Sequence, residues 1–292
     1  YVIGPKNGPS LLLIPAQIGM WESYKKVLIP LSKIFQVYSI DIRGHGKSTW
    51  TPGYYSWEIV GEDLKMFIKN VIKEKVKDRI YPFCWLDECY PENLQGLDNM
   101  PVLLWARGDV RKLSEKVNVA VIGTRTPTSY GAKMAQRIIS LLVSRNCNVI
   151  SGLALGCDTV AHSETVKAHG TTCAVLPSGV DNPVPASNKN LSNEILQKGG
   201  ILLSEYPLGH SPQKREFVER DRIVAALADI VIVIEAGEKS GTMHTVNYAL
   251  EYERPVLCTA HPQKYHNEET VKGIIKLVEE EKADPITSVE VL

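Results

Sequence analysis

The chain has 292 residues, of which 44% are hydrophobic, so it is long enough for one large domain or two domains of ordinary size. It contains no run of 18 or more apolar residues, which excludes a membrane-spanning helix of the usual kind. The 33 basic and 33 acidic residues balance, and a site for nucleic acid therefore needs a local cluster of positive charge.

The six cysteines are scattered and mostly lie inside apolar runs: Cys84, Cys89, Cys147, Cys157, Cys173 and Cys258. None forms a Cys-x-x-Cys pair, and no histidine stands at zinc spacing from Cys84 and Cys89. This usage is typical of reduced thiols in the core of a cytoplasmic protein. We expect neither a metal site nor a bound cofactor.

Residues 1–76 differ in character from the rest, since they carry 10 of the basic and only 6 of the acidic residues. Apolar runs predict short strands at 11–14 and 35–41, with a helix over 21–32 between them. The second strand ends in a sharp turn, Arg43-Gly44-His45-Gly46-Lys47-Ser48. An amphipathic helix is predicted over 60–75.

Residues 76–100 are predicted to form an irregular junction, because charged residues and Tyr-Pro pairs interrupt any regular pattern. Strands are then predicted at 102–105, 117–122, 148–150, 172–176, 201–203, 230–235 and 255–259. Helices are predicted at 130–146, 157–169, 188–198, 217–228, 243–253 and 268–281. This alternation indicates an α/β fold with a doubly wound, mostly parallel sheet. We therefore expect two domains, 1–76 and 77–292.

The strand at 117–122 is followed at once by a polar turn, Gly123-Thr124-Arg125, and then by a helix. Thr128 or Ser129 is placed to cap that helix, whose first backbone N–H groups remain free to hold an anion. The guanidinium of Arg125 is suited to bind a phosphate through two parallel hydrogen bonds.

A second polar turn follows the strand at 148–150. Ser151-Gly152 ends the strand, and Gly156, Asp158 and His162 stand at the start of the next helix. Because the carboxyl ends of neighbouring parallel strands face one crevice, we expect the two turns to meet there. Considered singly, His162 could be a satisfied buried histidine, and Asp158 could be a charge that stabilises the helix start.

Three later turns carry polar groups that a plain scaffold does not require. They hold Lys189, then Glu205, and finally Glu235 with Lys239-Ser240-Gly241-Thr242, and Arg220-Asp221-Arg222 stands early in the helix that follows Glu205. Hydroxyls and free N–H groups beside a glycine suit a phosphate. Each group also has a plainer interpretation: the serine and threonine as a helix cap, the arginines as a solvated face, and the two glutamates as partners that orient arginine side chains.

Taken in this order, the stretches resemble the DNA-processing protein A family (DprA, also called Smf). The matching segments are Tyr90 to Leu94, Pro101 to Leu104 with Arg107 to Asp109, Val121 to Arg125 with Tyr130-Gly131, Ser151 to Asp158 with Ala161-His162, Ser204 to Pro207, Phe217 with Arg220 to Arg222, and Glu235 with Ser240 to Thr242. The resemblance implies an extended Rossmann-like fold and a homodimer. It also implies a protein that binds single-stranded DNA, protects incoming DNA and loads a recombinase of the RecA type during DNA uptake and recombination.

By this resemblance, two sets of residues belong to the site, and none is assigned a catalytic role. The phosphates of a single strand would contact Gly123, Thr124, Arg125, Ser151, Gly152, Gly156, Lys189, Arg220, Arg222, Lys239, Ser240, Gly241 and Thr242, while Asp158, His162, Glu205 and Glu235 would shape the site. Arg125 is the first candidate for a phosphate contact. The family usually has Arg-Asn-Arg where this chain has Arg-Asp-Arg, so Asp221 adds a negative charge beside the expected DNA path.

Two further resemblances give alternatives. Residues 1–75 resemble the amino-terminal part of an α/β-hydrolase through Asp41 to Ser48, but no Gly-x-Ser-x-Gly occurs in the chain, so hydrolase activity is not expected. Glu235 and Ser240 to Thr242 resemble part of a nucleoside-monophosphate phosphoribohydrolase site of the lysine decarboxylase-like type. A bare interaction scaffold is the third possibility.

Overall fold

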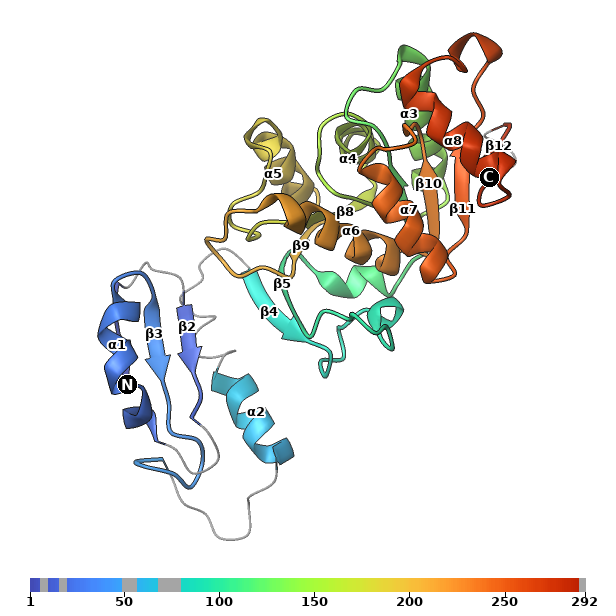
Figure 1. Ribbon diagram of the computed structural model, residues 1–292. Coiled ribbons are helices and arrows are strands. Elements are labelled where there is room, and N and C mark those ends of the chain that lie inside the picture. The colour runs from blue at the N-terminus through green and yellow to red at the C-terminus, as the bar shows by residue number, and fades with distance from the viewer. Residues whose placement is uncertain (6–9, 16–19, 49–56, 68–79, 289–292) are drawn as a thin grey trace. The chain divides into compact units, whose positions relative to one another are not determined.

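The computed structural model describes residues 1–5, 10–15, 20–48, 57–67 and 80–288. The chain divides into two compact units, Tyr1–Tyr81 and Pro82–Leu292. Strands form two separate sheets (Figure 1), one of three strands and one of nine. In the described part of the chain, every helix is too short or too polar to cross a membrane.

The first unit contains the three-stranded sheet, in the order β1-β3-β2. Its elements are β1 (Val2–Ile3), β2 (Ser10–Leu13), the 3-10 helix η1 (Trp21–Tyr24), α1 (Lys25–Ser32), β3 (Gln36–Ser39) and α2 (Trp57–Phe67). β3 pairs with β2 in parallel and with β1 antiparallel, and it is buried at all four positions. The helix predicted at 60–75 corresponds to α2 as far as Phe67, and its last eight residues lie outside the described ranges.

The second unit is built on the nine-stranded sheet, in the order β12-β11-β10-β6-β7-β8-β9-β5-β4. The strands are β4 (Ile80–Cys84), β5 (Leu103–Arg107), β6 (Asn118–Ile122), β7 (Asn148–Ser151), β8 (Thr171–Leu176), β9 (Ile201–Ser204), β10 (Ile230–Val233), β11 (Val256–Thr259) and β12 (Asp284–Ile286). The strands from β12 to β9 are parallel, and β5 runs antiparallel to β9. The predicted α/β fold with a mostly parallel sheet is confirmed.

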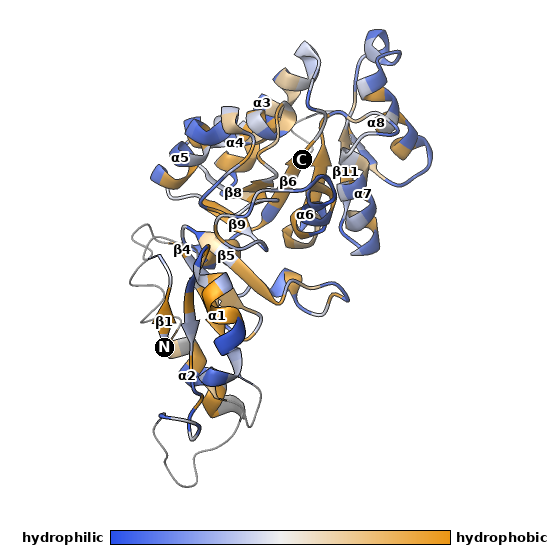
Figure 2. Cartoon of the chain, turned by 60° about the vertical axis from the view of Figure 1, so that its left-hand side comes forward, coloured by the Kyte–Doolittle hydropathy of each residue, from blue (hydrophilic) through white to orange (hydrophobic). Residues whose placement is uncertain are grey.

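Helices cover both faces of this sheet. They are α3 (Ser129–Ser144), α4 (Cys157–Lys167), α5 (Lys189–Gln197), α6 (Lys214–Leu227), α7 (Thr242–Glu251) and α8 (Glu269–Glu279), with short 3-10 turns η4 (Glu92–Leu94), η5 (Val110–Leu113), η6 (Ala186–Asn188) and η7 (Gln263–Tyr265). In Figure 2 the central strands lie between α3, α4 and α5 on one side and α6 and α7 on the other. β6 is buried at all five positions, because a parallel strand covered on both faces has no side facing water.

The two ends of the sheet differ from the predicted layout. The sequence predicts an irregular junction at 76–100, but β4 occupies Ile80–Cys84 as the last strand of the sheet. Pro82 is tolerated there because an edge strand leaves one row of N–H groups without a partner strand. β12, at the opposite edge, has no counterpart among the predicted strands and contains Pro285.

Candidate functional site

The order of the strands reverses at β6. From β6 the chain proceeds through β7, β8 and β9 on one side, and it then returns to place β10 on the other side of β6. Loops that leave the carboxyl edge of a parallel sheet in opposite directions open a crevice, and ligands of open α/β sheets bind there. A cleft of about 920 Å³ lies at this point.

Among the described residues, four loops and one side of α6 line the cleft, together with residues near the starts of α4 and α7. The predicted site residues among its lining are Gly123, Thr124, Arg125, Gly152, Asp158, Arg220, Ser240, Gly241 and Thr242. The turns after β6 and β7, which are expected to meet in one crevice, therefore face the same cleft, and the turn after β10 faces it as well.

The turn after β6 is fixed by backbone contacts. The N–H of Thr124 donates to the carbonyl of Glu235 at 2.7 Å, and the carbonyl of Thr124 accepts from the N–H of Cys157 at 3.0 Å. A Cβ on Gly123 would lie 2.6 Å from the Sγ of Cys157, so a side chain there would require a shift. Arg125 is exposed, and among the described residues no carboxylate lies within ion-pair distance of it. Its guanidinium is therefore available to a ligand.

Glu235 organises the loop from inside the protein. Its side chain is fully buried, and its carboxylate accepts hydrogen bonds from the N–H of Thr128 at 2.8 Å, from the hydroxyl of Thr128, and from Nε2 of His261 at 2.8 Å. Burial alone would raise the pKa of Glu235, but these hydrogen bonds hold that pKa below its ordinary value. Thr128 also caps α3, since its Oγ1 accepts from the N–H of Gly131 at 3.0 Å.

The turn after β7 is built on a buried carboxylate. Asp158, near the start of α4, accepts from the N–H groups of Gly152 at 3.1 Å and Ala154 at 3.2 Å. Gly156, with φ +77°, packs so closely that a Cβ would lie 2.4 Å from the carbonyl oxygen of Thr124. The hydroxyl of Ser151 donates to the carbonyl of Val121. Ser151 and Gly156 thus hold the turn without lining the cleft.

Arg220 and Asp221 on α6 form an ion pair at the cleft. The Nη1 of Arg220 donates to the carbonyls of Gly152 and Val175, and its Nε lies 3.1 Å from the carboxylate of Asp221. Burial raises the pKa of Asp221 to about 6, although the charge of Arg220 opposes the shift. Burial likewise raises the pKa of Asp158 against the effect of Arg220. Arg220 is 6% exposed, so most of its bonding capacity is used within the protein.

Several predicted site residues do not line the cleft. Arg222 pairs with Glu205, and His162 is buried with its Nδ1 on the hydroxyl of Thr172. Lys189 is exposed at the start of α5, and Lys239 is exposed near the end of the loop before α7; both lie outside the lining. The interpretation of a glutamate as an orienting partner holds for Glu205, whereas Glu235 orients Thr128 and His261.

Lys214 and His244 line the cleft but are absent from the predicted set. Lys214, Phe217, Val218 and Asp221 recur at helical spacing on α6, so the period of the helix places Lys214 on the side of Asp221, and the structure shows that this side faces the cleft. Three basic residues, Arg125, Lys214 and Arg220, and two acidic residues, Asp158 and Asp221, line the cleft among the described residues. The described residues contain no group of three His, Cys, Asp or Glu side chains able to hold a metal ion.

Ser240 adds an unused polar group to this lining. Its Oγ is buried and has no hydrogen-bond partner among the described residues. Beside it, α7 begins at Thr242, where the first N–H groups of a helix carry a partial positive charge. This wall of the cleft therefore favours a bound anion.

The sequence and the structure of this chain were compared with those of known proteins. A sequence model of the family described as DNA recombination-mediator protein A matches residues 82–292. The chain belongs to this family. The match covers the second unit, including every loop that lines the cleft.

Relatives and solved structures fall in the same group. Protein Smf from Synechocystis sp. is 36% identical over 216 residues, which is 68% of this chain and 53% of that protein. DNA processing protein DprA from Bacillus subtilis is 36% identical over 167 residues, 57% of this chain and 56% of that protein. The chain thus spans about half the length of these curated relatives.

Two solved DprA structures share the fold. The protein from Streptococcus pneumoniae superposes with a TM-score of 0.66 and 32% identity, over 82% of this chain and 81% of that one. The protein from Helicobacter pylori gives a TM-score of 0.66 and 29% identity, over 74% of this chain and 94% of that one. The latter structure was described for its mode of binding single-stranded DNA.

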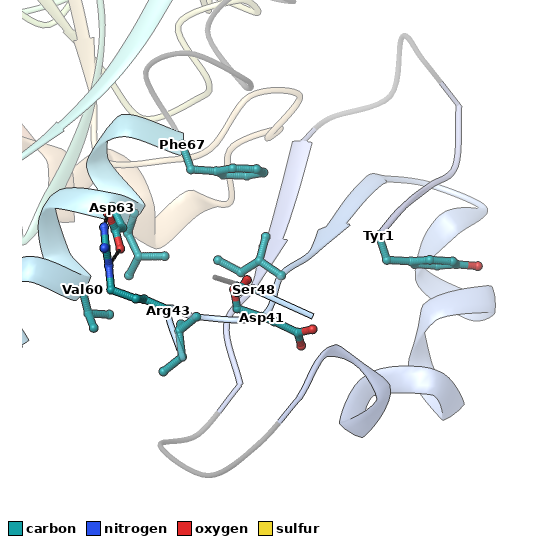
Figure 3. Close-up of a pocket in the computed structure, with 10 residues that line it drawn as sticks. Tyr1, Asp41, Arg43, Ser48, Val60, Asp63 and Phe67 are labelled. Carbon is teal, nitrogen blue, oxygen red and sulfur yellow. Dashed lines mark hydrogen bonds and ion pairs between the residues drawn. The ribbon is translucent and has the colours of Figure 1, made fainter. Parts of the chain in front are cut away.

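The first unit of this family member has a cavity of its own, of about 530 Å³ (Figure 3). Arg43 and Asp63 face each other there through two hydrogen bonds of 2.6 Å. The hydroxyl of Ser48 donates to the carbonyl of Asp41, and the carboxylate of Asp41 accepts from the N–H groups of Trp21 and Lys47. The turn from Asp41 to Ser48 is therefore held by its own hydrogen bonds. Its resemblance to an α/β-hydrolase stays a prediction.

Proposed function

We propose that this chain binds single-stranded DNA in the cleft at the carboxyl edge of its large sheet, as a protein of the DprA/Smf type. The observation that carries the proposal is the convergence of the turns after β6, β7 and β10 on one cleft, with the unpaired guanidinium of Arg125 at its surface. A guanidinium, the N–H groups at the start of α7 and the hydroxyl of Ser240 all suit phosphate oxygens. Contacts of this kind bind a strand whatever its sequence.

The wider role is proposed on the basis of family membership. We propose that the protein protects incoming single strands and assists a recombinase of the RecA type, that it acts as a homodimer, and that it works in the cytoplasm. The two-unit division, with residues 1–76 apart from the DprA-like residues 77–292, belongs to the same proposal. Lys189, Arg222 and Lys239 lie outside the cleft, and they would contact a strand only where it extends beyond the lining.

The phosphoribohydrolase alternative has less support. It requires the carboxylate of Glu235 to face a nucleotide, but that side chain is fully buried and is bound by Thr128 and His261. We therefore assign no catalytic residue. Release of a free base from a nucleoside monophosphate by the purified protein would reverse this choice.

Arg125→Ala tests the proposal. We expect roughly tenfold weaker binding of an oligothymidylate, because one charge-assisted phosphate contact is lost. The slope of log K against log salt concentration should become shallower by about 0.7, as for one phosphate released from a single strand. Both quantities are measured by fluorescence anisotropy over a salt series.

Arg137→Ala is the matched control. Arg137 is an exposed arginine on α3 that does not line the cleft, so its removal changes the net charge equally. Its affinity and salt slope should stay close to those of the wild type. Equal losses in both variants would mean that binding depends on overall charge, and the proposed cleft would then be wrong.

A further inference from the structure

Asp221 is an acidic residue of the lining, and phosphate binding does not explain its presence there. Its carboxylate sits among groups that attract a polyanion, and its side chain keeps 16% of its surface exposed. The Nε of Arg220 lies 3.1 Å from this carboxylate. At pH 7.5 the carboxyl is ionised, since its pKa of about 6 lies below that pH. Ionised Asp221 therefore repels phosphates in the cleft.

Asp158, the other acidic residue of the lining, is accounted for by the fold. Its carboxylate is 7% exposed and accepts two backbone N–H groups from its own turn. Asp221 has no such backbone donors among the described residues. Its remaining acceptor capacity is consequently open to a ligand, because a carboxylate can accept several hydrogen bonds.

The chemistry of a DNA strand restricts what this ligand group can be. Phosphate and deoxyribose within a strand offer no N–H or O–H donor, so only the bases can donate to a carboxylate. Thymine offers one ring N–H, and cytosine and adenine each offer one amino group. Guanine offers a ring N–H and an adjacent amino group, which match the two oxygens of a carboxylate. Unpaired bases expose these Watson–Crick edges.

The residues beside Asp221 suit a base. Phe217 lies four residues earlier on α6 and lines the same cleft, so its ring and the carboxylate project from one side of the helix. Leu155 and Pro185 also line the cleft and extend its apolar surface. An aromatic ring provides a stacking surface for a base of a single strand.

We infer that Asp221 reads the bases of the bound strand and gives the cleft a preference for guanine, with Phe217 as the stacking surface. This inference rests on the proposed function, since it requires a strand whose phosphates are held by Arg125 and the start of α7. Asp221 is a specificity-determining residue in this scheme. It adds discrimination among bases to a site that otherwise holds only the backbone.

The experiment compares three oligonucleotides of about 20 nucleotides, a length sufficient for one binding groove. One is all thymidine, one has single guanines spaced between thymidines, and one has inosine at those same positions. Isolated guanines avoid four-stranded assemblies, and inosine keeps the ring N–H but lacks the amino group. At pH 7.5 we expect the wild type to bind the guanine strand roughly tenfold more tightly than oligothymidylate, the value of one bidentate pair. Inosine should give an intermediate affinity.

Two variants assign the preference to the carboxylate. Asp221→Asn should remove most of the guanine preference, because the amide offers one acceptor instead of two. Glu219→Gln removes a charge from the same helix at a residue that pairs with Tyr206 outside the cleft, and it should keep the preference intact.

Each other outcome has a defined meaning. Equal binding of all three strands by the wild type overturns the inference and leaves the proposed function standing. A uniform loss for all strands in Asp221→Asn, with the preference retained, also overturns it, because Asp221 would then only position Arg220. Failure of the wild type to bind any strand overturns the proposed function together with the inference.

Discussion

Two buried polar side chains, Glu235 and His162, are not among the residues that line the cleft, although both interact with residues that do. The carbonyl of Glu235 holds Thr124, and its carboxylate holds Thr128. The charge of Arg220 acts on the imidazole of His162. The sequence marks both residues as shaping the site, and the structure indicates how they could do so: through hydrogen bonds and fixed charge.

His162 should remain neutral in mild acid. Burial, followed by the charge of Arg220, lowers its pKa to about 3. An unfolded histidine binds a proton below pH of about 6.5, so the unfolded state gains protons first. From pH 6.5 down towards 3, this group should therefore lower the free energy of unfolding by up to about 1.4 kcal/mol per pH unit. An NMR titration of the imidazole signals measures the pKa of His162, and the His162→Asn variant assigns its signal. A midpoint near the ordinary pKa of histidine would contradict the expectation.

Which arginine of Arg220-Asp221-Arg222 reaches the cleft could not be predicted from the sequence. The three residues are consecutive on a helix and point about 100° apart, so the rotation of α6 decides their roles. That rotation depends on packing with α7 and the sheet, which no local pattern encodes. Arg220 consequently turns to Gly152, and Arg222 turns to Glu205.

Among the elements, α3 has a start that is connected to the cleft through Glu235. Thr128 caps this helix and donates to the buried carboxylate of Glu235. Thr128→Ala should lower the free energy of unfolding by about 2 kcal/mol, because it removes a helix cap and leaves a buried acceptor short of one donor. Urea denaturation measures the change.

Ser140→Ala is the control for Thr128→Ala. The hydroxyl of Ser140 is exposed and donates only to the carbonyl of Gln136 within α3, so its loss should cost less than about 0.5 kcal/mol. If Thr128→Ala were no more destabilising than Ser140→Ala, the cap and its bond to Glu235 would have no role in stability.

The elements between 102 and 281 could be predicted from the sequence because two patterns are clear there: apolar residues at helical spacing and continuous apolar runs in the strands. Buried parallel strands such as β6 are unbroken apolar runs, and Gly-Thr or Ser-Gly turns end them. The edge strands β4 and β12 were not predicted. Each contains a proline, and each forms a strand by pairing with a neighbouring strand of the sheet. The hydrogen bond between Glu235 and His261 was also not predicted, because it joins residues 26 positions apart that follow two neighbouring strands of the sheet.

At the scale of the whole molecule, the formal net charge of zero hides an uneven distribution. Residues 1–76 hold an excess of basic residues, and residues 77–292 hold 23 basic and 27 acidic residues. The cleft nevertheless collects Arg125, Lys214 and Arg220 in an acidic unit. Local arrangement, and not average charge, determines where a polyanion is attracted.

All residues that line the cleft belong to the second unit. We therefore expect the segment 80–292, which keeps β4 complete, to fold alone and to bind oligothymidylate within about threefold of the full chain, since the removed residues that the structure describes supply no part of the lining. Circular dichroism melting and anisotropy measure the two properties. A loss of binding greater than tenfold, in a segment that still melts cooperatively, would mean that residues 1–79 contribute to the site.

The reversal of strand order at β6 also governs when the cleft can exist. Its walls come from Gly123 to Arg125 and, more than a hundred residues later, from Ser240 to Thr242. While the chain is being synthesised, a copy that has left the ribosome only as far as β9 has the first wall and lacks the second. Unfinished copies and those cut short before α7 would thus have no complete groove, and they should bind its ligand less tightly than the finished protein does.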